Sequence, residues 1–354
     1  MSPAPGRTPA PRRLAALATV GVVAAAGITG LVARGAAADP VLPPLTAAEL
    51  LTNLATADVA GLSATFEQRS DLGLPTLPSG MGETGDELQD ALTLLTGSHT
   101  VRVWRAAPDR AKVALVDGDT ERSVVRNGDQ VWTWSSERQQ VGHATIVPGE
   151  KEPATTPDPT AAVSRLLAAL EPTTDLATSG TGYVAGRPVY QLVLTPKDAD
   201  SLVAEVRVAV DSTEFVPLGV RVVADDGTDA VSLTATSVDF GTPDPAVFEF
   251  TPPPGAEVKE LRKPQARDHG TAGGTDRPRL VGTGWTTVAV AELGELPEDQ
   301  AARALLASLP EVSGAWGSGR LLSTALVNVV LTEDGRVAVG SVAPERLYAA
   351  LAAK

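Results

Sequence analysis

Residues 248–258 read Phe248-Glu249-Phe250-Thr251-Pro252-Pro253-Pro254-Gly255-Ala256-Glu257-Val258. The two phenylalanines stand at the period-two spacing of a β-strand, and three prolines follow almost at once. Proline has no backbone N–H to give to a β-ladder, so the prolines are expected to end the strand. The stretch therefore predicts that a sheet closes at 248–251 and that a domain ends near Gly255.

The chain before this point has the pattern of two β-meanders. A strand is expected at 63–68, and apolar and polar residues alternate through much of 99–146, where Asn127-Gly128 is a strong hairpin signal. A second alternating series runs from Tyr190 to about Phe240, with a tight turn at Asp226-Gly227. Links this short require antiparallel strands.

Two helices are expected beside these strands. Thr46 and Glu49 form a capping box, which predicts a helix over 47–59. A second helix is expected from Asp158-Pro159 to Pro172, because the residues between them include an i, i+3, i+4, i+7 apolar face made by Val163, Leu166, Leu167 and Leu170. The residues between the first strand and the first meander, 72–98, read as a long loop.

The last hundred residues read as a linker and a second module. Residues 256–279 are charged, contain glycine and show no period, which is typical of a linker. Residues 280–354 predict a small α+β domain. Its expected elements are a strand at Leu280–Ala291, a helix at Pro297–Leu309, a hairpin at Asp334-Gly335 and a last helix from Pro344.

The N-terminus predicts export. Residues 1–13 hold three arginines and no acid, Leu14–Ala33 carry no charge, and Ala36-Ala37-Ala38 precedes Asp39. This is the pattern of a signal peptide cleaved after Ala38. The apolar run is also long enough to stay as a membrane anchor, and both alternatives place residues 39–354 outside the cytoplasm.

Charge and cysteine content exclude several classes of protein. Four of the 29 basic residues and none of the 43 acidic ones lie in residues 1–38, so the rest of the chain carries a formal charge of −18. Such a surface repels nucleic acid. The chain has no cysteine, so it forms no disulfide and carries no lipidated cysteine.

No pattern in the chain indicates catalysis, a metal or a cofactor. The histidines His99, His143 and His269 are far apart and are expected at strand surfaces or in solvent. Asp117-Gly118-Asp119 and Asp225-Asp226-Gly227 are interpreted as turns between strands. Nucleophile-elbow and phosphate-loop motifs are lacking.

Several short segments, in this order, resemble the LolA/RseB (MucB) superfamily. They are Ala64–Gln68, Val103-Trp104 with Pro108-Asp109-Arg110, Asn127–Trp134, Leu192–Lys197 and Phe248–Gly255. The resemblance covers about residues 46–258 and implies a LolA-like domain at 45–255. That fold is mainly β (α+β): an antiparallel sheet curls into an incomplete barrel, closed by helices, around a cavity for acyl chains. Ala107 and Ala111 replace the arginine and the aromatic residue that LolA carriers have beside the proline.

The resemblance implies an apolar site and two functions. Apolar residues on the predicted strands are the candidate lining of a cavity, with an ordinary sheet–helix core as the alternative for the tryptophans: Phe66, Trp104, Val113, Leu115, Trp132, Trp134, Leu192 and Leu194. The expected function is non-enzymatic binding of a lipid or lipoprotein acyl chain outside the cytoplasm. The alternative is an RseB/MucB-like regulator that binds a membrane anti-sigma factor or another protein partner, with residues 280–354 as the contact.

Overall fold

The computed structural model describes residues 39–74, 96–106, 109–146, 170–261, 278–292 and 306–353. The predicted signal peptide or anchor lies outside these residues, and so do His269, almost all of the predicted helix before Pro172 and most of the predicted loop at 72–98. Residues Pro40–Lys354 form one compact unit. Within the described part of the chain, no helix has the length and apolar character needed to cross a bilayer.

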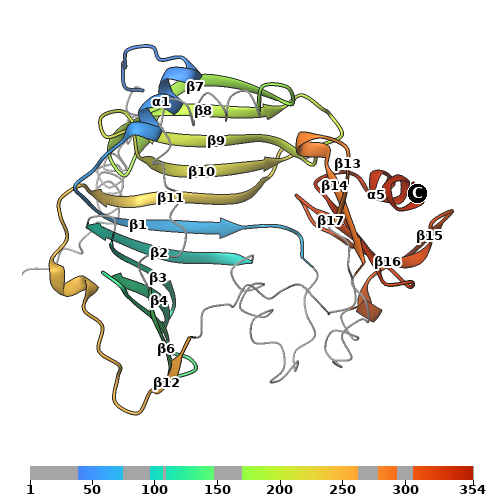
Figure 1. Ribbon diagram of the computed structural model, residues 1–354. Helices are drawn as coiled ribbons and strands as arrows, with labels where there is room; N and C mark the ends of the chain where they lie inside the picture. Colours follow the sequence, from blue (N-terminus) through green and yellow to red (C-terminus); the bar gives the residue numbers. More distant parts are fainter. Residues whose placement is uncertain are drawn as a thin grey trace, which may run out of the picture. The chain divides into compact units, whose positions relative to one another are not determined.

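In the described residues, twelve strands form one large sheet, in the order β12-β6-β5-β4-β3-β2-β1-β11-β10-β9-β8-β7 (Figure 1). All neighbours are antiparallel except β12 and β6, and the sheet does not close into a barrel. The predicted mainly β fold with a large antiparallel sheet is therefore confirmed. The strands are β1 Gly61–Ser70, β2 Gly97–Ala106, β3 Arg110–Asp117, β4 Thr120–Asn127, β5 Gln130–Ser135, β6 Gln140–Thr145, β7 Thr174–Val184, β8 Arg187–Pro196, β9 Val203–Asp211, β10 Pro217–Ala224, β11 Asp229–Asp239 and β12 Glu257–Glu260.

Strand β1 joins the two predicted meanders into this single sheet. It pairs with β2 on one side and with β11 on the other. The predicted turns connect neighbouring strands: Gly128 lies between β4 and β5 at φ 61°, and Gly227 lies between β10 and β11 at φ 85°. Both glycines adopt the left-handed conformation that other residues avoid, which is why the sequence signal at these turns was reliable.

The N-terminal helix α1, Ala47–Thr56, packs on one face of the large sheet, and the capping box at its start is confirmed. Its Leu50 is completely buried and packs in a cluster with Tyr190, Leu192 and Val210. We call the side of the sheet that carries Leu192 the α1 face. The helix ends at Thr56, three residues before the predicted end.

The predicted closing strand at 248–251 is wrong. Residues Pro245–Phe248 form a 3₁₀ turn (η1) capped by Asp244, and Phe248 is buried against β3 and β4. The sheet continues beyond the prolines with β12, which lies inside the predicted linker. The two phenylalanines pack against the sheet instead of extending it. The prolines end pairing only where they stand, so the chain can join the ladder again three residues later.

The C-terminal residues build a second, smaller sheet of six described strands, in the order β13-β14-β18-β17-β16-β15. Helix α5, Pro344–Ala352, packs on it over a core that includes Leu347, Leu351 and Trp316. The predicted hairpin at Asp334-Gly335 and the predicted last helix are confirmed. The strands are β13 Arg279–Val281, β14 Val288–Glu292, β15 Glu311–Gly314, β16 Gly317–Ser323, β17 Asn328–Thr332 and β18 Arg336–Gly340.

The single strand expected at Leu280–Ala291 is in fact a hairpin. Strands β13 and β14 are separated by the 3₁₀ turn η2, Gly284–Thr286, with Gly282 and Gly284 at positive φ. Two left-handed residues cannot continue a strand, so the glycines mark a turn that the apolar pattern alone did not reveal. Of the helix expected at Pro297–Leu309, residues 306–309 are described, and 306–308 are helical while Leu309 is a bend.

Candidate functional site

The β-sheet register divides the eight predicted lining residues between two faces. Residues paired across antiparallel strands point to the same side of a sheet. Leu192 pairs with Val208, and the row continues through Val220 and Leu233 to Gln68, two residues from Phe66 in β1. Phe66, Val113, Leu115, Leu192 and Leu194 therefore all lie on the α1 face.

The three tryptophans lie on the opposite face, which we call the tryptophan face. Trp132 in β5 pairs with Val125 in β4, and Val125 pairs with Lys112 in β3. Lys112 in turn pairs with Trp104 in β2, so Trp104 and Trp132 lie on the same side. Trp134 is two residues from Trp132 in β5 and shares its side. The prediction that Trp132 and Trp134 share a strand face agrees with this register, but the structure does not place them with the aliphatic candidates.

Much of the tryptophan face is a packed layer. The ring of Trp132 stacks on His143 with centroids 4.0 Å apart and contacts Phe250 at 5.5 Å. Val125 in β4, a strand that η1 contacts, and Val141 in β6 are each only 1% exposed. Trp104 borders a cavity of about 210 Å³ and carries Lys112 5.5 Å from its ring centroid. The alternative interpretation of an ordinary core therefore describes Trp132 well.

The α1 face holds an open apolar groove. Its volume is about 410 Å³, and Val113 and Val124 are 44% and 48% exposed there. Half-exposed valines side by side on adjacent strands cost solvation free energy and are typical of a binding surface. The residues that line the groove are Val113, Leu115, Arg122, Ser123, Val124, Thr133, Trp134, Ser135, Arg138, Gln140, Val141, Gly142, Lys259 and Leu261.

Strand β12 brings Leu261 to the edge of this groove. The Leu261 backbone N–H donates to the carbonyl of His143 at 2.6 Å, and His143 Nδ1 lies 2.9 Å from a Glu260 carboxylate oxygen. A Cβ added to Gly142 would lie 2.8 Å from Leu261 Cδ1 and 2.4 Å from Thr133 Oγ1. A larger residue at 142 would force the side chains of Leu261 and Thr133 to move. Sequence reasoning missed Leu261 because the prolines seemed to end the domain before it.

Three of the eight predicted residues border the groove: Val113, Leu115 and Trp134. Val113 and Leu115 belong to the α1 face, whereas the register puts the Trp134 side chain on the tryptophan face. Leu192 and Leu194 pack beneath α1, and Phe66 packs against a separate cluster with Leu218 and Ala235. The groove residues that sequence reasoning left out include Val124, whose place beside the Asn127-Gly128 hairpin was visible in the alternating pattern.

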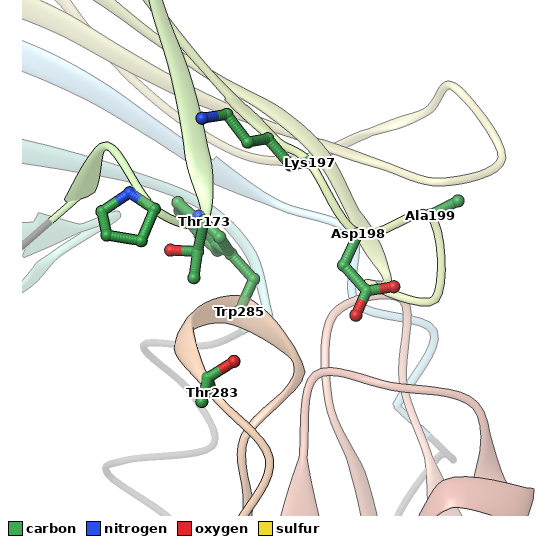
Figure 2. A pocket seen from close by; sticks show the side chains of 7 residues that line it. Thr173, Lys197, Asp198, Ala199, Thr283 and Trp285 are labelled. Atoms are coloured by element: carbon green, nitrogen blue, oxygen red, sulfur yellow. The ribbon is translucent and has the colours of Figure 1, made fainter.

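A more polar cavity of about 430 Å³ lies where the two sheets meet (Figure 2). Its side chains are tied to neighbours: Trp285 Nε1 donates to Thr174 Oγ1 at 2.8 Å, and Thr286 Oγ1 donates to Asp198 at 3.1 Å. The Asp200 amide, and then the Thr286 hydroxyl, hold the pKa of Asp198 below its usual value. This arrangement is a structural junction.

In the described residues, packing accounts for His99 and turn geometry accounts for the aspartate motifs. His99 is only 6% exposed, with Nε2 2.8 Å from the Thr96 carbonyl, so its predicted surface position is wrong. His99 pairs with Gln68 of β1, so it lies within the paired part of the sheet. A single polar residue near the start of a strand gives no sequence signal for such burial. Asp117-Gly118 and Asp226-Gly227 occupy the predicted turns. Among the described residues, no three His, Asp or Glu side chains are grouped as a metal site.

Together, the fold and the groove define a mainly β protein with an open antiparallel sheet, one apolar face under a helix and a second small sheet. It is similar to MucB in the Pseudomonas aeruginosa MucA/MucB complex, with 18% identity, a TM-score of 0.46 and coverage of 86% of this chain and 96% of that one. It is also similar to a putative outer membrane lipoprotein-sorting protein domain from Vibrio parahaemolyticus, at 12% identity and a TM-score of 0.23 over 57% of this chain and 95% of that one.

A LolA superfamily protein from Nitrosomonas europaea matches at 11% identity and a TM-score of 0.22, over 58% of this chain and 99% of that one. The Nitrosomonas europaea protein is described as a member of the LolA superfamily, which the sequence motifs resemble. Because the identities are below 20% and the TM-scores below 0.5, we base the fold class on the sheet topology described above. No family model matches the chain, and no curated protein sequence matches it.

Proposed function

We propose that this chain is a non-enzymatic binding protein, acting outside the cytoplasm, that holds an acyl chain of a lipid or lipoprotein on its α1 face. One observation carries the proposal: the groove exposes Val113, Val124 and Leu261 to solvent on a chain of formal charge −14. Burying these side chains against a ligand removes their apolar area from water, which is the driving force for binding.

The size of the groove is in keeping with this ligand class. Small-molecule sites in proteins usually enclose about 300–1,000 Å³, and the groove offers about 410 Å³. Each fully buried methylene contributes about 0.8 kcal/mol, so a sixteen-carbon chain would contribute at most on the order of 10 kcal/mol before ordering costs. An acyl chain is thus long enough to bind well through apolar contact alone.

Native mass spectrometry tests this function. The purified chain is measured as isolated and after incubation with a long-chain acyl probe, and co-purifying material is extracted with solvent. We expect a lipid adduct that Val124→Asp removes. Val258→Asp is the matched control, because Val258 is 49% exposed but its partner Val141 places it on the tryptophan face. A clean mass with no lipid bound under either condition would contradict the proposal.

A second function, protein binding through residues 280–354, is favoured by the small sheet itself. It has its own hydrophobic core, and its first strand exposes Leu280 to 66%. An exposed leucine on an edge strand suits addition of a partner strand. In this alternative the chain is a regulator of the RseB/MucB kind with a membrane protein partner. Affinity purification with Leu280→Lys tests it, and recovery of the same partners by the variant and the wild type would count against it.

A further inference from the structure

The described lining of the groove is rich in basic side chains, although the chain as a whole is acidic. Among the described residues, the fourteen that line it include Arg122, Arg138 and Lys259 but no aspartate or glutamate. The whole chain has 43 acidic and only 29 basic residues. The described lining is therefore more basic than the composition of the chain, and a group of cations beside an apolar floor suits a ligand that has an anionic group.

The β-sheet register places two of these cations beside the apolar floor. Arg122 pairs with Leu115 across β3 and β4, so its side chain shares the α1 face with that leucine. Lys259 pairs with Gly142 and is two residues from Leu261, so it lies on the same face at the opposite side of the groove. Arg138 belongs to the turn between β5 and β6.

Arg122 and Lys259 each pair with an exposed carboxylate, and the phosphate of a ligand can take the place of that carboxylate. Arg122 Nη2 lies 3.0 Å from Glu137 Oε2, and Lys259 Nζ lies 3.6 Å from Glu257 Oε1. The two glutamate side chains are 60% and 62% exposed, and ion pairs in water contribute little to stability. A guanidinium group matches the geometry of a phosphate with two parallel hydrogen bonds.

We propose that the groove selects an anionic phospholipid. One acyl chain lies on Val113, Val124 and Leu261, and the phosphate contacts Arg122 and Lys259 at the rim. This inference rests on the proposed function and adds the headgroup to it. A zwitterionic lipid of the same chain length fills the same apolar floor, but its cationic headgroup opposes the arginine and the lysine.

Calorimetric titration with two short-chain, water-soluble lipids tests the headgroup. Dihexanoyl phosphatidylglycerol is expected to bind the wild-type chain about tenfold more tightly than dihexanoyl phosphatidylcholine at low salt. The double variant Arg122→Gln/Lys259→Gln is expected to reduce this preference to within about twofold. The control Arg69→Gln/Arg221→Gln removes two exposed cations elsewhere on the sheet and should keep the preference. At about 1 M salt, where the screening length is about 3 Å, the preference should fall for the wild type as well.

The possible results separate the two proposals. If both lipids bind the wild type equally and Val124→Asp abolishes both, the acyl site stands and the anionic headgroup is wrong. A preference that survives in Arg122→Gln/Lys259→Gln, or that is lost equally in the control, also overturns the inference. If neither lipid binds, the headgroup preference is wrong, and the mass-spectrometric test with the long-chain probe decides whether the acyl site stands.

Discussion

Asp211 is the most completely buried charged residue among those described, with an exposed fraction of 0%. Arg187 donates to both of its carboxylate oxygens, from Nε at 2.5 Å and from Nη2 at 3.0 Å. Burial by itself would raise the pKa of Asp211, but the hydrogen bonds from Arg187 and from the Glu214 and Thr213 amides hold it below its usual value. This carboxylate therefore stabilises the fold only while it is ionised.

We expect Arg187→Ala to lower the free energy of unfolding at neutral pH by about 3–5 kcal/mol, because it leaves a buried charge without its partner. Arg221→Ala, which breaks an exposed pair with Asp229, should cost about 0–1 kcal/mol. Urea unfolding of both variants measures the difference. Equal, small losses would show that the Arg187–Asp211 pair does not stabilise the fold.

The same pair gives the wild type a dependence on pH. The Asp211 contribution is fully present above the unfolded pKa of about 3.9 and is lost as the pH falls through the lower folded value. Arg187→Ala removes the main cause of the low pKa, so its stability should fall less than that of the wild type on acidification. Urea unfolding at neutral pH and near pH 3 measures how much free energy of unfolding each protein loses on acidification. Equal losses for the wild type and Arg187→Ala would contradict this explanation.

At the scale of elements, α1 is held by its capping box and by one buried leucine. Thr46 Oγ1 accepts from the Glu49 amide at 3.2 Å, and Glu49 accepts from the Thr46 amide at 2.8 Å. Leu50 lies in the cluster with Leu192 and has no exposed surface. The helix therefore covers one end of the apolar α1 face and leaves the groove between β3 and β12 open.

Leu50→Ala should cost about 2–5 kcal/mol, because it removes buried methyl groups and leaves a cavity under the helix. Thr46→Ala should cost about 1 kcal/mol through loss of the N-cap. Thr56→Ala, an exposed change at the end of the helix, is the control and should be nearly neutral. Thermal unfolding ranks the three variants, and a different order would show that α1 is not anchored in this way.

The sequence predicted elements well wherever a local rule determines them. Alternating residues with Asn127-Gly128 and Asp226-Gly227 identified most of the large sheet, and Thr46 identified α1. It failed where long-range packing decides: Phe250 packs on Trp132, which is 118 positions earlier in the chain, and β12 pairs in parallel with β6. Long-range pairing also explains why the eight predicted lining residues lie on two different faces of the sheet. Alternation shows which residues of one strand share a side, but it does not show which side another segment covers.

At the scale of the whole unit, a few contacts join the small sheet to the large one. Arg346 lies 2.9 Å from an Asp200 carboxylate oxygen, and Ser201 and Val342 form an isolated antiparallel bridge. Gly284 packs directly on Thr173: an added Cβ would lie 2.5 Å from Thr173 Oγ1. The turn around Trp285 therefore needs a glycine both for its conformation and for this close approach.

We expect Gly284→Ala to weaken the junction more than a matched glycine substitution elsewhere. Gly227 also has positive φ but has open space around it, so Gly227→Ala measures the conformational cost alone, about 1–2 kcal/mol. Gly284→Ala adds the clash with Thr173 and should also shift the fluorescence of Trp285. Partial rescue by Thr173→Gly would support this explanation, and equal losses at the two glycines would refute it.

Photolabelling with an acyl chain that carries a diazirine at its end tests the central claim most directly. The labelled chain is digested, and the modified residues are mapped by mass spectrometry. If the α1 face is the binding surface, labels will fall on β3, β4 and Leu261 and will be suppressed by excess unlabelled lipid and by Val124→Asp. Suppressible labels on Trp104 and the tryptophan face, with none around Val124, would contradict the account.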